Sequence, residues 1–158
     1  MQGKYLLRRA TPEDEEVLLI WKNDPITREN SGDSRLVTPE EHHNWFTKRL
    51  QSDNVLLYIF CADGRPAGQG RLDLLGYTAE ISYGLAPEFR GKGLGRKLLT
   101  QLIEKVASDP QASEISVLYG QVKYTNVISK RLFSSLGFKE VMEPSKSGEM
   151  VLYKKVVR

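Results

Sequence analysis

The sequence predicts an α/β fold of the α+β kind, built on a mixed, mostly antiparallel sheet of six to seven strands with helices on both faces. Three segments between residues 55 and 85 read as strands that follow one another directly, which indicates an antiparallel meander. Beyond residue 90, helical and strand patterns alternate, which favours helices packed over the sheet. A glycine-rich loop joins these two halves of the chain.

The size and composition of the chain suit a single domain over residues 1–158. With 158 residues, of which 40% are hydrophobic, the chain can bury a substantial core. Its longest apolar run, Val55 to Ala62, is far shorter than the roughly 20 residues that span a bilayer, and the amino terminus lacks a signal-peptide pattern. We therefore expect a cytoplasmic protein that does not enter a membrane. The single cysteine, Cys61, excludes an intramolecular disulfide, and its place in an apolar strand favours a buried, unreactive thiol.

The first half of the chain begins with one strand and two helices. Tyr5 to Arg9 reads as the strand, and Thr11-Pro12 supplies an N-cap followed by proline at the first helical position. This helix should end at Asp24-Pro25. Thr38 and Glu41 form a capping-box pattern that opens the second helix.

The meander follows these helices. Val55 to Ala62 and Ala67 to Leu74 read as strands joined by a hairpin turn at Asp63-Gly64. A further strand follows Gly76-Tyr77 and continues to Leu85.

The second half alternates helices with strands. A helix with apolar residues at helical spacing follows the glycine loop, and the later elements are, in order, a strand from Glu114 to Val122, a helix from Asn126 to Leu136, a strand from Phe138 and a strand from Met150 to Val157. Gly137 is expected to close the helix before it in a left-handed conformation. The segment from Pro144 to Gly148 is expected to be a mobile loop.

The glycine loop is the sequence Arg90-Gly91-Lys92-Gly93-Leu94-Gly95, followed by Arg96 and Lys97, between a strand and a helix. Glycines let the main chain turn tightly with its N–H groups inward, and the first turn of a helix adds unpaired N–H donors and the positive end of the dipole. Four cationic side chains and no acid lie in this stretch, so the expected ligand is a diphosphate.

Two common phosphate loops are excluded by spacing. A Rossmann loop needs a third glycine where Arg96 stands, and a P-loop needs Ser or Thr where Gly93 follows Lys92. The pattern that remains is Arg-x-x-Gly-x-Gly.

This pattern at a strand-to-helix junction resembles the acetyl-CoA loop of the GCN5-related N-acetyltransferase (GNAT) superfamily. A second segment resembles the same superfamily, because Asn126-Val127-Ile128-Ser129, then Phe133 and Leu136-Gly137-Phe138, match its Asn-x-x-Ala/Ser helix that ends in Gly-Phe. The resemblance covers most of the chain. It implies a GNAT fold and acetyl-CoA as cosubstrate.

The resemblance also implies how the cosubstrate binds. Its cofactor-binding residues correspond here to Leu85, Arg90, Gly91, Lys92, Gly93, Leu94, Gly95, Arg96 and Asn126. In the superfamily two central strands splay apart, which would leave main-chain N–H groups near Leu85 to bind pantetheine and polarise the thioester carbonyl. Pro87, which has no N–H, fits the point where this strand leaves the sheet.

Glu80 is the candidate general base. Strand alternation places Glu80, Ser82 and Gly84 on one face of the strand. An exposed glutamate on a solvated strand is the ordinary explanation. Ala79-Glu80-Ile81, however, resembles the corresponding strand of related acetyltransferases, which favours a carboxylate that takes a proton from the ammonium group, directly or through a water.

Ser129 is the candidate that stabilises the leaving thiolate. Many superfamily members have a tyrosine seven residues after the motif asparagine, where this chain has Phe133. Ser129 shares a helix face with Asn126, and some related ribosomal-protein acetyltransferases use a serine near this position. The alternative is that Ser129 is simply small enough to let the cosubstrate pass. Tyr83 and Tyr124 are reserve candidates.

Charge and histidine content exclude two other functions. A net charge of +3 is too small to indicate nucleic-acid binding by bulk electrostatics. His42 and His43 are adjacent, and adjacent positions on a helix point about 100° apart, so they cannot chelate one metal together. We expect no metal. One of the two histidines should pack beside Trp45, and the other should face the acceptor.

The acceptor is the least determined part of the function. Trp21-Lys22-Asn23-Asp24-Pro25, Arg28 and the segment from Glu41 to Phe46 resemble the acceptor half of acetyltransferases that modify nucleotide-linked amino sugars, such as those of the pseudaminic acid pathway. Their aromatic and Asn/His side chains could stack a base or sugar. The same half also resembles ribosomal-protein N-terminal acetyltransferases.

Two plainer explanations stay open. The aromatic residues of the acceptor half also lie at the core-facing spacing of amphipathic helices. A domain that binds acyl-CoA without turnover would keep the glycine loop too. The sequence leaves the oligomeric state open.

Overall fold

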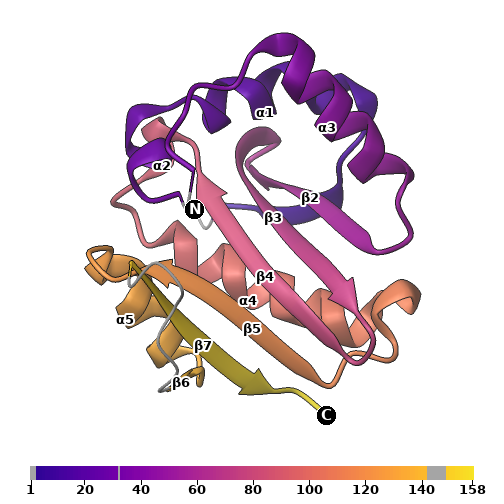
Figure 1. The fold of residues 1–158 in the computed structure, drawn as a ribbon, viewed down its shortest axis with the longest axis vertical. Helices are drawn as coiled ribbons and strands as arrows, with labels where there is room; N and C mark the ends of the chain where they lie inside the picture. The colour runs from indigo at the N-terminus through magenta and orange to yellow at the C-terminus, as the bar shows by residue number, and fades with distance from the viewer. Residues whose placement is uncertain (1–2, 32, 142–148) are drawn as a thin grey trace.

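A computed structural model describes residues 3–31, 33–141 and 149–158 as seven strands in one sheet with helices on both faces (Figure 1). The strands are β1 (Tyr5–Arg9), β2 (Val55–Ala62), β3 (Arg65–Leu75), β4 (Thr78–Leu85), β5 (Val117–Lys123), β6 (Lys139–Val141) and β7 (Met150–Val156). Their order in the sheet is β1-β2-β3-β4-β5-β7-β6. Among the described strands only β4 and β5 pair in parallel, which confirms the mixed, mostly antiparallel sheet.

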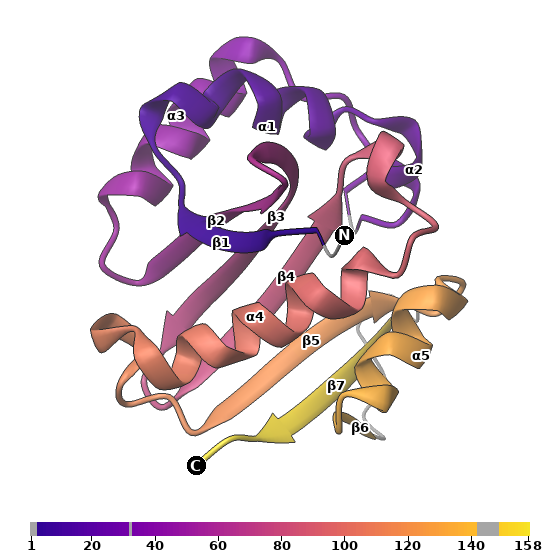
Figure 2. The same ribbon diagram turned by 180° about the vertical axis from the view of Figure 1, so that it is seen from behind.

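The α-helices are α1 (Glu15–Lys22), α2 (Pro25–Glu29), α3 (Pro39–Gln51), α4 (Leu94–Ser108) and α5 (Val127–Ser135). Short 3₁₀ turns lie at Pro12–Asp14, Pro87–Phe89 and Pro110–Ala112. Seen from behind, α4 and α5 lie over one face of the sheet (Figure 2). No helix among the described residues is long and apolar enough to cross a membrane.

Two hydrophobic clusters hold these layers together. One lies between the sheet and α4, where Leu98, Leu99 and Leu102 are fully buried. The other lies on the opposite face, where Leu18 and Trp21 of α1 and Phe46 of α3 pack against β2. Burial of each large apolar side chain contributes about 1.5–3 kcal/mol. Cys61 is buried in the second cluster, as its apolar strand predicted.

The predicted turns and caps are confirmed. Asp63 and Gly64 both have positive φ, 51° and 81°, as a two-residue hairpin turn requires. Gly137 has φ 91° just after α5. The Thr38 side chain accepts a hydrogen bond from the N–H of Glu41 at 3.1 Å and caps α3.

Among the α-helices, the prediction missed α2. Asp24-Pro25 ends α1, but the Asp24 carboxylate also accepts the N–H of Thr27 at 3.0 Å and so begins a new helix. An Asp-Pro pair is both a stop signal and an N-cap with proline at the first helical position, and the sequence does not distinguish the two uses. The predicted loop from Pro144 to Gly148 lies outside the described residues.

Candidate active site

The glycine loop turns from β4 into α4 as the sequence predicted. Gly91 and Gly93 both have φ 75°, a conformation that L side chains rarely adopt, and Gly93 is the N-cap of α4. No atom lies within 4 Å of where a Cβ would stand on either glycine, so these positions border open space. Gly95 differs, because a Cβ there would lie 3.2 Å from Leu132 of α5, and glycine permits close packing.

The start of α4 is built to accept an anion. Its first N–H groups have no acceptor within the helix, and no acidic side chain lies in its first turn. Gly91, Lys92 and Gly93 are all exposed. The loop therefore presents main-chain donors and the positive end of a helix dipole to solvent.

The cationic side chains of the loop do not all converge on this point. Arg90 donates to Asp24 Oδ2 at 2.7 Å and to Thr27 Oγ1 at 3.0 Å, which ties the loop to α2. Burial alone would raise the pKa of Asp24, but the hydrogen bonds from Arg90 and from the Thr27 N–H outweigh it and lower the pKa. Lys97 lies over the ring of Tyr5 at 4.9 Å.

Lys92 and Arg96 are the remaining cations. Lys92 lies 5.7 Å from the centre of the Phe89 ring, and Arg96 donates to Ser135 Oγ at 2.7 Å. The first contact is weak and the second is exposed, so both side chains can turn toward an anion at the loop.

Beside the loop, β4 and β5 separate. They pair only at Thr78↔Val117, Ala79↔Leu118 and Glu80↔Tyr119. Because the N–H of Ala86 bonds to Ala67 on β3, strand alternation directs the N–H of Leu85 toward the opposite edge, where the described part of β5 provides no partner. The N–H of Leu85 therefore lies on an open edge of β4.

A pair of hydroxyl groups lies at this opening. Tyr83 of β4 and Ser129 of α5 are hydrogen-bonded, with 3.0 Å between their oxygens. Ser129 is 6% exposed, and burial raises the pKa of Tyr83, although the bond to Ser129 opposes the rise. The tyrosine therefore stays protonated at neutral pH. Tyr124, the other reserve candidate, is exposed.

Phe133 and Asn126 have structural roles in α5. Phe133 is buried in edge contact with Phe138 at 4.9 Å, and a Cβ on the facing Gly120 would lie 2.6 Å from its ring. The side chain of Asn126 caps the helix by accepting the N–H of Ser129 at 3.2 Å. Asn126 therefore fixes the main chain that carries Ser129.

Glu80 points to the other face of the sheet. It is exposed and stands opposite Asp73 of β3. Although the residue as a whole is exposed, neighbouring protein atoms partly desolvate the carboxylate, which raises its pKa; the charge of Asp73 raises it further, and Arg71 opposes both. A carboxylate with a raised pKa suits proton abstraction.

Arg71 and Asp73 are site residues that the sequence reasoning missed. Arg71 Nε donates to Asp73 Oδ2 at 2.9 Å, and the guanidinium lies 5.6 Å from the centre of the Trp45 ring. The alternation of residues along β3 could have predicted them. Polar side chains alternate there with smaller or apolar ones, so the polar side chains share one face of the sheet; they are Gln69, Arg71 and Asp73.

In the acceptor half, the structure shows where the aromatic residues and the two histidines lie. Trp21 and Phe46 are core residues, as the packing alternative had it. His42 packs beside Trp45 with ring centres 5.8 Å apart, as expected for one histidine. The other histidine, His43, is exposed and pairs with Glu15 of α1 at 2.7 Å. Adjacent helix positions diverge, so burying His42 turns His43 outward.

His42 is an unusual core residue. It is 3% exposed, and its Nδ1 has no hydrogen-bond partner among the described residues. Burial lowers its pKa, with Glu15 opposing and the charges of His43 and Lys22 adding to the lowering, so the ring is neutral in the folded protein at pH 7.

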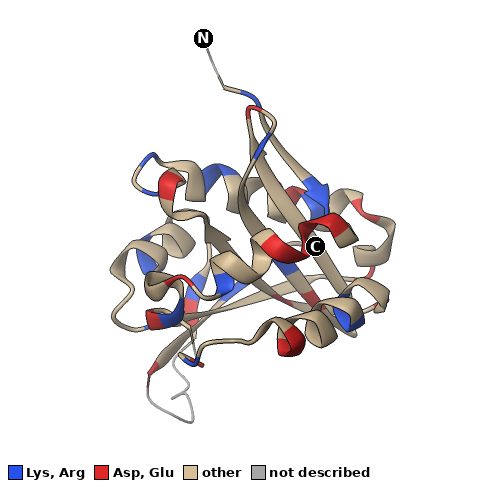
Figure 3. Cartoon of the chain, turned by 90° about the horizontal axis from the view of Figure 1, so that it is seen from above, with Lys and Arg blue, Asp and Glu red and all other residues tan. Residues whose placement is uncertain are grey.

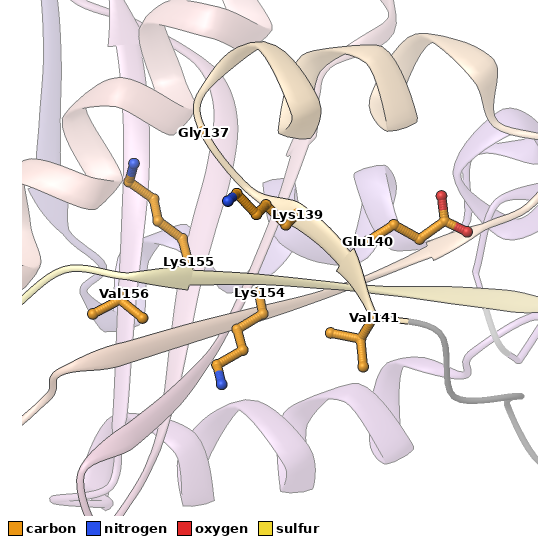
Figure 4. Close-up of a pocket in the computed structure, with 7 residues that line it drawn as sticks. All are labelled: Gly137, Lys139, Glu140, Val141, Lys154, Lys155 and Val156. Atoms are coloured by element: carbon orange, nitrogen blue, oxygen red, sulfur yellow. The ribbon is translucent and has the colours of Figure 1, made fainter.

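Two further surface features of the described residues were compared with this site. A hollow of about 510 Å³ lies against β6 and β7, but in Figure 4 the amino groups of Lys154 and Lys155 point to opposite sides of the strand. Charged residues of both signs are spread over the molecule in Figure 3. The residues in the described ranges include no cluster of three or more His, Cys, Asp or Glu that could hold a metal.

The arrangement matches a known family. The acetyltransferase (GNAT) domain matches residues 4–139 of this chain. The chain belongs to the GNAT family. As a GNAT acetyltransferase domain, it has the sheet with a parallel central pair, the opening beside that pair and the glycine loop before α4 described above.

Two curated relatives of this GNAT domain are acetyltransferases by name. The [ribosomal protein bS18]-alanine N-acetyltransferase of Haemophilus ducreyi is 29% identical over 94 residues, which are 60% of this chain and 55% of that protein. The putative phosphinothricin acetyltransferase YwnH of Bacillus subtilis is 29% identical over 147 residues, 85% of this chain and 83% of that protein. The aligned region thus spans just over half of the first relative.

The fold of this GNAT domain is also seen in solved structures. Spermidine N-acetyltransferase from Vibrio cholerae, solved in complex with CoA and spermine, superposes with a TM-score of 0.81 at 18% identity, covering 96% of this chain and 95% of that chain. At this identity the likeness shows the fold.

Proposed function

We propose that this GNAT domain transfers an acetyl group from acetyl-CoA to a primary amine by direct attack on the thioester, with a nucleotide-linked amino sugar as the acceptor. The observation that carries the proposal is the opening between β4 and β5, which has the glycine loop at one end and Glu80 near the other. The CoA bound to the Vibrio cholerae enzyme of the same fold supports the choice of cosubstrate.

The two ends of the cosubstrate would meet different groups of this chain. The diphosphate would lie on the N–H groups of the loop at Gly91, Gly93 and the start of α4, with Lys92 and Arg96 turned toward it. The Leu85 N–H would donate to the thioester carbonyl and stabilise the negative charge that grows on its oxygen. Bound there, acetyl-CoA supplies an activated acetyl group.

Glu80 and the Tyr83–Ser129 pair would move the protons. Glu80 takes one proton from the ammonium group, which leaves the nitrogen lone pair to attack the carbonyl carbon. As the carbon–sulfur bond breaks, Ser129 donates its hydroxyl proton to the sulfur and accepts one from Tyr83 at 3.0 Å. The proton that the new amide nitrogen loses restores the pair, and Glu80 returns its proton to water.

Ser129→Ala should lower kcat by about 10- to 100-fold with little change in the affinity for acetyl-CoA, because the hydroxyl acts mainly in the transition state. Tyr83→Phe should have a smaller effect in the same direction, since Ser129 could then exchange its proton with water. Steady-state kinetics together with acetyl-CoA titration check this. The control is Ser108→Ala, which removes an exposed hydroxyl at the end of α4, away from the glycine loop. Wild-type kcat in both test variants would mean that Ser129 is only small enough to let the cosubstrate pass and takes no part in proton transfer.

The amino-sugar acceptor is favoured by the polar row beside Glu80. Gln69 and Arg71 of β3 and Ser82 of β4 lie on the face of Glu80 and offer hydrogen bonds to sugar hydroxyls and phosphate. The second candidate, a ribosomal-protein amino terminus, is favoured by the Haemophilus ducreyi relative.

A competition assay separates these acceptors. A UDP-linked 4-amino sugar and an alanine-terminated peptide of protein bS18 are mixed with acetyl-CoA and enzyme, and both products are measured by mass spectrometry. We expect faster acetylation of the sugar, because a nucleotide supplies remote binding energy that holds the amine at the thioester. Preferential acetylation of the peptide would reject the sugar. If neither acceptor causes thiol release, and no amine of a wider panel does so, the result would favour a domain that only binds acyl-CoA.

A further inference from the structure

The short helix α2 is held in place by polar contacts rather than by the hydrophobic core. None of its five residues is buried. It lies at the end of the sheet toward which β4 and β5 point (Figure 1 and Figure 2). A short helix is not stable by its own propensity, so without a buried face its position depends on the hydrogen bonds that link it to its neighbours.

One of these links joins α2 to the glycine loop. Arg90 Nη2 donates to Asp24 Oδ2 at 2.7 Å and to Thr27 Oγ1 at 3.0 Å. The Asp24 side chain is only 13% exposed, and its carboxylate also accepts the N–H of Thr27 that begins the helix. If Arg90 turned away to a diphosphate, this mostly buried carboxylate would lose its counter-charge, which is costly. We therefore expect Arg90 to stay with Asp24 when the loop is occupied.

A second link joins the other end of α2 to β5. Lys123 Nζ donates to the main-chain oxygen of Glu29 at 2.7 Å. Lys123 ends β5, whereas Arg90 follows β4 after a short turn. The helix is therefore attached on both sides of the opening between these two strands, where the cosubstrate and the amine would meet.

We propose that Arg90 and Asp24 are positioning residues for the acceptor: they attach α2 to the glycine loop, so that a ligand in the loop orders α2 and improves binding of the amine. Gly91 and Gly93 give the empty loop conformational freedom, which a diphosphate held by the N–H groups of the loop removes. Arg90 directly precedes Gly91 and passes this ordering to Asp24. The inference rests on the proposed acetyl transfer and adds residues that determine how its acceptor binds.

Hydrogen exchange of the α2 amides measures this coupling without requiring turnover. The N–H groups of Arg28 and Asn30 are hydrogen-bonded within α2 and report on its opening. Saturating acetyl-CoA should slow their exchange in the wild-type protein by about 5-fold or more, the lower end of typical coupling between two sites. Arg90→Gln and Asp24→Asn should bind acetyl-CoA with little change in affinity and lose the slowing. Asparagine is also a good N-cap, so Asp24→Asn removes the charge and keeps the helix.

Three further variants separate this role from its alternatives. Arg90→Lys keeps a positive charge beside Asp24 and should keep most of the slowing. Asp33→Asn breaks an exposed Asp–Arg pair in the segment after α2 and should behave as wild type. Lys92→Gln removes a cation proposed for the diphosphate, so it should weaken acetyl-CoA binding but keep the slowing once the ligand is saturating.

Steady-state kinetics test the effect on the acceptor. With an amine that the wild-type enzyme acetylates, Asp24→Asn should raise the KM for the amine by about 5-fold or more. Its kcat and its KM for acetyl-CoA should stay near the wild-type values, because the variant loses binding that is equal in the ground state and the transition state. An unchanged KM for the amine would reject the role of the pair in acceptor binding.

The exchange results distinguish failure of this inference from failure of the proposed function. The inference is overturned if acetyl-CoA does not slow exchange in the wild-type protein, if the slowing persists in Arg90→Gln or Asp24→Asn, or if Arg90→Gln loses most of its acetyl-CoA affinity. Slowing without acetylation of any amine would keep the coupling and reject the transfer reaction. If acetyl-CoA does not bind, the proposed function fails, and the measurement is repeated with inorganic pyrophosphate; the absence of slowing would then overturn the coupling as well.

Discussion

Gly93→Asp should abolish the stabilisation of this protein by acetyl-CoA. A ligand at 100-fold excess over its dissociation constant stabilises a fold by about 2.7 kcal/mol, which should raise the melting temperature of the wild-type protein by several degrees. An aspartate at the N-cap of α4 places a carboxylate where the N–H groups of the loop would hold the diphosphate. Thermal unfolding with and without acetyl-CoA measures the effect.

The structure supplies a matched control for this variant. Gly76 also has positive φ and no atom within 4 Å of a Cβ, but it lies in the turn before β4, at the other end of that strand from the glycine loop. Gly76→Asp therefore carries the same conformational strain and the same added charge, and it should keep the full shift. An acetyl-CoA shift that survives in Gly93→Asp would place the diphosphate elsewhere.

Glu80→Gln should lower kcat by about 100-fold or more, the range for loss of a positioned general base. The loss should be largest at mildly acidic pH, where fewer amine molecules are already neutral. The carboxylate acts when deprotonated, so wild-type activity should rise with pH through a pKa above the ordinary glutamate value, and this rise should be absent from Glu80→Gln. Glu104→Gln, an exposed change on α4, is the control.

Asp73, the neighbour of Glu80, allows a second test, in which the direction of the shift in the pH profile is defined. Asp73 raises the pKa of Glu80, so Asp73→Asn should shift the rise in activity to lower pH. A pH profile unchanged in both variants would show that another group takes the proton.

The sequence was sufficient where a feature depends on neighbours along the chain. The strand Val55–Ala62 was placed correctly because a continuous apolar run bounded by a turn signal admits few alternatives. The turn at Asp63-Gly64 and the cap at Gly137 were placed because their backbone conformations demand particular residues. The glycine loop was placed by both kinds of signal, an apolar strand pattern before it and glycines at positions where the backbone must turn. The α/β class followed from the order of the strands and helices along the chain.

The tertiary structure decided whatever depends on partners distant in the chain. Arg90 was counted with the diphosphate cations, yet its guanidinium binds Asp24, 66 positions away. Tyr83 and Ser129, 46 positions apart, meet only because β4 and β5 separate and α5 packs over the gap. Local propensity fixes what each segment becomes, whereas the pairing of side chains across the opening is set by packing and by the cost of leaving buried charges and hydrogen-bonding groups unpaired.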